Sequence, residues 1–163
     1  MRTEGLFING VFDSVLEEIL QVQAVLPEQI LFLQPHSSRP ITRLRMSPPG
    51  VDDPMRLFIS TSTNLPTVSY AAEIVGWDDK RKLLRAKRLV VERIIKTFQP
   101  GEGGLYDLSP VAGVSVNLLH IRRLEKLKRS FAVDRLTKVV GGGLLSTNRS
   151  MSGGWSYVRP EPR

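Results

Sequence analysis

The strongest indication of the fold comes from two stretches near the middle of the chain, MRLFIS at residues 55–60 and VSYAAEIVGW at residues 68–77. Both are short and rich in β-branched and aromatic side chains, which favours strands. The sequence Asn64-Leu65-Pro66 between them is typical of a turn. We therefore expect two strands joined by a turn.

Further strands are expected on both sides of this pair, over residues 4–10, 29–33, 116–124 and 153–158. One helix is predicted to begin at Ser14, because Glu17 three residues later completes a capping box, and Pro27 ends it. Asp13 is an alternative cap for the same helix.

The clearest helix is predicted over residues 80–98, where apolar side chains recur at helical spacing and basic residues fall largely outside their stripe. The stripe consists of Leu83, Leu84, Val90, Val91, Ile94, Ile95 and Phe98. Residues 36–54 resemble a loop, and a short helix or turn is expected over residues 133–139.

Many short strands with few helices predict an α+β domain, namely a small curved or closed mixed β-barrel flanked by two or three helices. The length of 163 residues fits one domain, which we expect to span residues 1–158, with a frayed tail at residues 159–163.

Composition excludes several classes of function. The chain has no cysteine, so disulfides, thiol nucleophiles and Cys-ligated zinc are impossible. It has two histidines, His36 and His120, which cannot form an HExxH metalloprotease motif. No run of about 18 apolar residues is present. We expect a soluble, cytoplasmic protein that does not enter a membrane.

Charge is unevenly distributed along the chain. Residues 1–79 carry a net charge of −5 and residues 80–163 a net charge of +12. The basic residues concentrate in two segments, 80–99 and 122–138. Such clustering is expected of a protein that binds a polyanion, although solvated basic faces without a partner are also common.

A second candidate chemistry is a metal-dependent nuclease. Asp78-Asp79-Lys80 follows an apolar strand, and Asp52 or Asp53 lies upstream. Two carboxylates and a lysine in such an arrangement hold Mg²⁺ and position the attacking water, so Asp53, Asp78 and Lys80 would be the catalytic set. Asp78 and Asp79 are equally suited to cap the following helix, and we favour capping.

Aromatic and polar residues near strand ends suggest a pocket for a flat heterocycle. Trp77 and Trp155 are the two tryptophans of the chain, and Tyr70 shares the strand of Trp77. Aromatic walls stack on a base, and hydroxyl and amide groups recognise its edge. Tryptophans that merely fill the core are the alternative explanation.

The segments Leu57-Phe58-Ile59-Ser60-Thr61 and Tyr70 to Trp77 resemble the PUA-like superfamily, and within it the EVE and related modified-base readers. Ala72 to Gly76, and the late Asn148-Arg149-Ser150 with Trp155, are the matching pieces. Leu6-Phe7 stands where EVE domains commonly carry a tryptophan.

This resemblance implies a non-catalytic module that holds an exposed base, on DNA more readily than on RNA, without cofactor or metal. Its partner would be a nuclease or another effector of a restriction or defence system. It implies that Trp77, Trp155 and Tyr70 stack on the base. It implies that the base edge or its phosphate is contacted by Ser60, Thr61, Ser62, Asn148 and Arg149. The backbone would be held by Lys80, Arg81, Lys82, Arg85, Arg88, Arg122, Arg123, Lys126, Lys128 and Arg129.

Two alternatives stay open at this point. One is the nuclease described above. The other is a small adaptor or inhibitor that docks its basic face on an acidic protein.

Overall fold

The computed structural model describes residues 2–101, 108, 115–148 and 154–160. Its elements are β1 (Gly5–Val11), α1 (Asp13–Val25), β2 (Leu31–Leu33), α2 (Arg43–Met46), β3 (Met55–Thr61), β4 (Thr67–Asp79), the 3₁₀ turn η1 (Lys80–Lys82), α3 (Arg85–Phe98), β5 (Asn117–Ala132), the 3₁₀ turn η2 (Val133–Arg135), β6 (Leu136–Lys138) and β7 (Trp155–Pro160).

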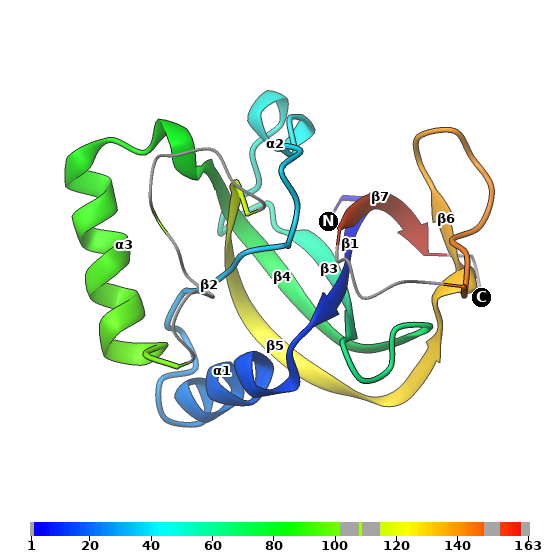
Figure 1. Cartoon of the computed structure of the whole chain (residues 1–163), viewed down its shortest axis with the longest axis horizontal. Coiled ribbons are helices and arrows are strands. Elements are labelled where there is room, and N and C mark those ends of the chain that lie inside the picture. Colours follow the sequence, from blue (N-terminus) through cyan, green and yellow to red (C-terminus); the bar gives the residue numbers. More distant parts are fainter. Residues whose placement is uncertain (1, 102–107, 109–114, 149–153, 161–163) are drawn as a thin grey trace.

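The strands form one mixed sheet in the order β2-β5-β4-β3-β1-β7-β6. The expected pair of strands is confirmed as the antiparallel hairpin β3–β4, in which Met55 lies opposite Ile74 and Ile59 opposite Tyr70. β1 is parallel to β3 and antiparallel to β7. Figure 1 shows α3 and β6 at opposite ends of the curved sheet. The α+β class is therefore confirmed, but the sheet of the described residues is open and has β2 and β6 as edges, so it does not form a closed barrel.

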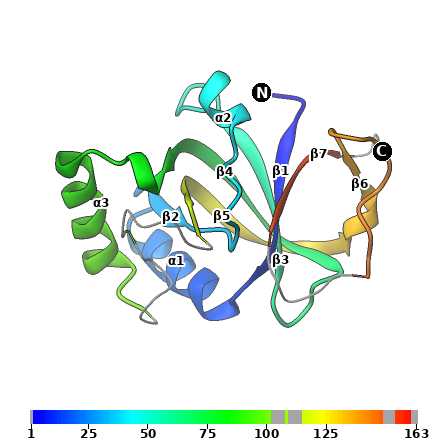
Figure 2. The same cartoon turned by 45° about the horizontal axis from the view of Figure 1, so that its top comes forward.

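Side chains alternate between the two faces of the central strands and supply separate cores. Leu6 and Ile8 of β1 belong to the main core with residues of α1, whereas Phe7 packs with Phe58 on the other face. A third cluster fixes α3, since Val91 packs near Phe32 and Leu118. Figure 2 shows α1 and α3 at the β2 end of the sheet, away from β6.

β5 is much longer than the strand expected over residues 116–124. Its second half is rich in exposed basic residues and so lacks the apolar pattern that marks a buried strand. Ala71 lies opposite Glu125 and Glu73 opposite Arg122, so β5 has one extra residue there, with Arg123 at a φ of +53°. Such a bulge bends a strand and increases its twist.

The helix boundaries differ from the prediction. α1 begins at Asp13, ahead of the predicted cap Ser14, and no side chain caps it, so the capping box of Ser14 and Glu17 is wrong. Asp13 instead accepts a hydrogen bond of 2.7 Å from Thr63 Oγ1. The helix expected from Lys80 is divided into η1 and α3. Asp79 caps η1 by accepting from the backbone N–H of Arg81, as expected of a cap.

Three further predictions need adjustment. Residues 36–54 contain the short helix α2 within the expected loop. The turn expected over residues 133–139 holds η2 and then the edge strand β6. Arg159 and Pro160 belong to β7, so the predicted frayed tail is wrong for these two residues, and residues 161–163 lie outside the described part.

A side-chain amide closes the outer edge of β2. The Gln99 side chain donates from Nε2 to the carbonyl of Phe32 (2.8 Å), and its Oε1 accepts from the N–H of Phe32 (2.9 Å). Gln99 is 1% exposed, so these are buried hydrogen bonds that imitate a neighbouring strand. The contact joins the end of α3 to the edge of the sheet.

We expect Gln99→Ala to lower the free energy of unfolding by about 2–4 kcal/mol, because it leaves two buried backbone groups of Phe32 without this partner. Chemical denaturation measures the change. Gln21→Ala, at an exposed position on α1, is the control and should change stability by less than about 0.5 kcal/mol. Equal effects of the two substitutions would show that the Gln99 amide does not stabilise the edge.

Candidate nucleic-acid interface

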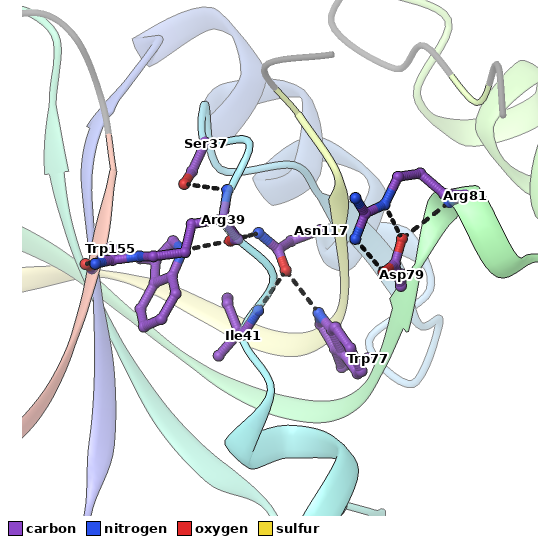
Figure 3. A network of polar contacts seen from close by, with 8 residues as sticks. All are labelled: Ser37, Arg39, Ile41, Trp77, Asp79, Arg81, Asn117 and Trp155. Atoms are coloured by element: carbon purple, nitrogen blue, oxygen red, sulfur yellow. Dashed lines mark hydrogen bonds and ion pairs between the residues drawn. The ribbon is translucent and has the colours of Figure 1, made fainter. Parts of the chain in front are cut away.

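A loop that follows β2, here called the strap (residues 36–46), is held on the sheet by one buried amide. Asn117, at the start of β5, is fully buried. Its Nδ2 donates to the carbonyl of Arg39 and its Oδ1 accepts from the N–H of Ile41, each at 2.9 Å. Figure 3 shows Asn117 at the centre of this network. The strap therefore has a fixed position, although its sequence predicts only a loop.

Both tryptophans are part of the same network. Trp77 Nε1 donates to Asn117 Oδ1 at 2.9 Å, and Trp155 Nε1 donates to the carbonyl of Arg39 at 3.0 Å (Figure 3). Trp77 lies on β4 and Trp155 on β7, which are not neighbours in the sheet. The strap thus joins two aromatic residues that the strand order alone would keep apart.

Three arginines of the strap lie over aromatic rings. The Cζ atom of Arg39 is 4.2 Å from the ring centre of Trp155, and Arg45 is 5.8 Å from that of Trp77. Arg43 is 4.9 Å from the ring of Tyr157, whose hydroxyl accepts from the Arg43 backbone N–H. All three arginines are exposed. The result is a cationic surface backed by aromatic rings.

The sequence does not single out these arginines as candidate site residues. The available signal was their spacing, because positions 39, 43 and 45 hold three of the five basic residues among the first 79. The composition of residues 36–46 predicts only a loop, and nothing in this segment predicts which aromatic rings the three arginine side chains contact.

The predicted base-binding residues do not come together as one pocket. Trp77 and Trp155 share the strap network, but Tyr70 is buried in the main core. Burial, together with the negative charges of Asp13 and Glu17, raises the pKa of the Tyr70 hydroxyl. This tyrosine is therefore a core residue rather than a stacking surface.

The predicted polar residues lie elsewhere. Ser60 is fully buried and donates to Asn9 Oδ1 at 3.1 Å. Thr61 is also buried, and the backbone of Ser62 donates to the carbonyl of Val11. These three residues join the ends of β1 and β3. Asn148 is exposed beyond β6, and Arg149 lies outside the described residues.

The predicted phosphate-binding residues divide into several groups. The side chain of Lys80 is buried, with 2% exposed, so it does not face solvent. Arg81 is held by both oxygens of Asp79. Arg122 is buried and donates to Glu73 and to the carbonyl of Val51.

The remaining cations lie at two separate places. Arg123 is exposed but pairs with Glu73 at 3.1 Å. Lys82 lies in η1 and Arg85 and Arg88 in the first turns of α3, whereas Lys126, Lys128 and Arg129 lie in the second half of β5. Figure 1 shows β5 running toward β6 and away from α3. The two predicted basic segments therefore do not form one continuous surface.

The residues of the nuclease hypothesis are engaged in other contacts. Asp53 pairs with Arg2 at 3.0 Å. Asp78 Oδ2 lies 2.7 Å from His120 Nε2, and Asp78 Oδ1 lies 2.8 Å from Lys87 Nζ. In the part of the chain that the structure describes, no three His, Cys, Asp or Glu side chains gather in a way that could hold a metal ion.

The Asp78–His120 pair depends on a close approach at Gly76. A Cβ atom built on Gly76 would lie 2.7 Å from His120 Nδ1. Any other residue at this position would displace the imidazole ring. Because Asp78 also binds Lys87, the pair connects β4 and β5 to the first turn of α3.

Comparison with known proteins adds no family, since no protein-family model, curated protein or solved structure matches this chain. Of the helices in the described ranges, none has the length and apolar character needed to cross a membrane.

Replacing Asn117 should loosen the strap and expose both indoles. We expect Asn117→Ala to reduce stability by about 2–5 kcal/mol, because it removes the partner of three polar groups. Tryptophan emission should also shift to longer wavelength, since both tryptophans of the chain bind this network. Asn64→Ala, at an exposed turn position, is the control. Unchanged emission in a folded Asn117→Ala protein would contradict this account.

Because of Asp78, the free energy of unfolding should depend on pH in the acid range. Burial raises the pKa of its carboxyl, but hydrogen bonds from His120 and Lys87 outweigh burial, so the pKa is lowered from its ordinary value of 3.8. The ionised Asp78 carboxylate therefore stabilises the fold fully at pH values above 3.8. This stabilisation is lost as the pH falls through the lowered pKa.

We expect the stability difference between the wild type and Asp78→Asn to shrink when denaturation is measured at about pH 3 instead of pH 7. Asp52→Asn, an exposed position, should change stability by less than about 0.5 kcal/mol at both pH values. A difference for Asp78→Asn that is equal at both pH values would refute the role of its charge.

Proposed function

We propose that the chain is a non-catalytic nucleic-acid-binding module whose binding surface is the strap with the neighbouring start of α3. The observation that carries this proposal is the set of three exposed arginines stacked over Trp155, Tyr157 and Trp77. Arg39 Nη2 donates to the carbonyl of Trp155, and Arg43 Nη1 pairs with Glu4 at 3.2 Å. The guanidinium of Arg45 and the remaining N–H groups of Arg39 and Arg43 are the donors that would bind phosphate or the edge of a base.

The tryptophans give the surface a means of binding bases. Both indoles are partly exposed, and their N–H groups are occupied by Asn117 and Arg39. Arg39 lies over the ring of Trp155 and Arg45 over that of Trp77, so a base would stack on the guanidinium groups that these rings support, since bases stack on arginine planes as well as on aromatic rings. A base in a single strand or flipped from a duplex has the exposed face that stacking needs.

The start of α3 supplies positive charge beside the strap. Asp79, which caps η1, lies opposite Asn117 in the sheet. Lys82, Arg85 and Arg88 follow directly, and none of them forms an ion pair with another described residue. The phosphate backbone of a strand bound at the strap would reach these cations.

The proposal includes a PUA-like fold in an open form and DNA as the preferred ligand. The curved mixed sheet, the β3–β4 hairpin and a late strand with Trp155 support this relationship. As in modified-base readers, a nuclease or another effector would act on the nucleic acid that this module binds.

The test is fluorescence-anisotropy titration with single-stranded DNA, plain and 5-methylcytosine-containing duplexes, and structured RNA. We expect Arg39→Ala/Arg45→Ala to weaken DNA binding about tenfold or more. The slope of log affinity against log salt concentration should also become shallower, by about one for each phosphate that the variant no longer neutralises. Binding to the wild type should quench tryptophan emission, because both indoles lie at the surface in question.

The matched control is Lys126→Ala/Lys128→Ala, which removes two exposed cations at the other end of β5. Equal losses in the two double variants would indicate unspecific electrostatic binding and reject the strap as the site. Cleavage of the probe with Mg²⁺ would favour the nuclease instead.

A further inference from the structure

The outer face of α3 carries aliphatic side chains that the fold does not bury. Leu89 is 53% and Val90 56% exposed, whereas Val91 on the inner side is 2% exposed. Val90 and Leu84 were predicted to belong to the apolar stripe of this helix, and this prediction is wrong because both are exposed, Leu84 to 78%. Helix α3 therefore has apolar residues on two sides.

Cations accompany these exposed aliphatic residues. Arg93 and Lys96 follow Leu89 at spacings of four and seven, so the three side chains lie on one face of the helix. Both cations are exposed, and neither forms an ion pair with any other residue that the structure describes. Leu89, Glu92, Arg93, Lys96 and Thr97 line an open hollow of about 310 Å³. We call Leu89, Val90, Glu92, Arg93, Lys96 and Thr97 the docking face, which carries two cations and one carboxylate.

We propose that the docking face binds an amphipathic, acidic helix of a partner protein. Carboxylates of the partner would pair with Arg93 and Lys96, and leucine-like side chains would bury Leu89 and Val90. Helices bind in this manner through apolar anchors at spacings of three and four residues. The charges set orientation and encounter rate, and burial of the aliphatic groups contributes the affinity.

The aliphatic residues distinguish this partner from nucleic acid. Phosphate groups would pair with Arg93 and Lys96 equally well, but they would leave Leu89 and Val90 in water. A protein helix satisfies both kinds of group at once. The docking face lies on the second half of α3, next to the cations at the start of the helix that belong to the proposed nucleic-acid surface, and the two surfaces share no residue.

The probe is a displayed library of random 16-residue peptides, selected on the full chain. We expect enrichment of helix-forming peptides with Asp or Glu beside leucine-like residues at spacings of three or four. A synthetic copy of the best peptide should bind at least tenfold more weakly to Leu89→Ser/Val90→Ser and to Arg93→Glu/Lys96→Glu. Higher salt should weaken its binding to the wild type.

Matched controls separate the docking face from general surface effects. Val25→Ser/Val140→Ser removes two exposed aliphatic side chains elsewhere, and Lys128→Glu/Arg129→Glu reverses two exposed cations on β5. Both controls should bind the peptide as the wild type does. Circular dichroism checks that every variant keeps its helices.

Three results would overturn the proposal. The first is the absence of such a consensus, or a peptide whose binding is insensitive to Leu89→Ser/Val90→Ser. The second is a wild-type dimer in light scattering that Leu89→Ser/Val90→Ser dissociates, because a second copy would then cover the face. The third is single-stranded DNA that displaces the peptide from the wild type and whose own binding is lost in Arg93→Glu/Lys96→Glu but unchanged in Leu89→Ser/Val90→Ser.

Discussion

Three side-chain amides that act as backbone partners hold this structure together. Asn117 pairs with the N–H and C=O groups of the strap, and Gln99 pairs with those of Phe32 at the edge of β2. Gln23 of α1 does the same for Leu124, beside the bulge in β5. A buried backbone group without a partner is costly, so each amide fixes a segment that the sheet alone would leave unpaired.

The position of the candidate site follows from one of these amides. Because Asn117 binds both Trp77 and the strap, the loop stays at the end of the sheet where β4 turns into η1. Arg39, Arg43 and Arg45 are then placed over aromatic rings, on the side of the molecule where α3 begins. Charge and stacking are in this way combined at one end of the molecule, and the docking face on α3 presents a different chemistry.

Several features were predictable because they depend on local physics. The β3–β4 hairpin follows from β-prone residues around a turn, and the capping role of Asp79 follows from its place before η1. The second half of β5 was missed because its charged residues carry no apolar signal. The residues predicted to form one pocket lie in different parts of the structure for a related reason. The residue types of Tyr70 and Ser60 do not reveal whether their side chains line a pocket or fill a core.

Residue types and their spacing were enough to predict the α+β class, the positions of most strands, and the acidic and basic halves of the chain. These depend on residue type and short-range periodicity. Tertiary structure alone decided that Lys80 and Arg122 are buried, that Leu89 and Val90 face solvent, and that Arg39 meets Trp155 across 116 positions. Such outcomes depend on which segments pack together, and that is set by sheet order and by buried hydrogen bonds between residues distant in sequence.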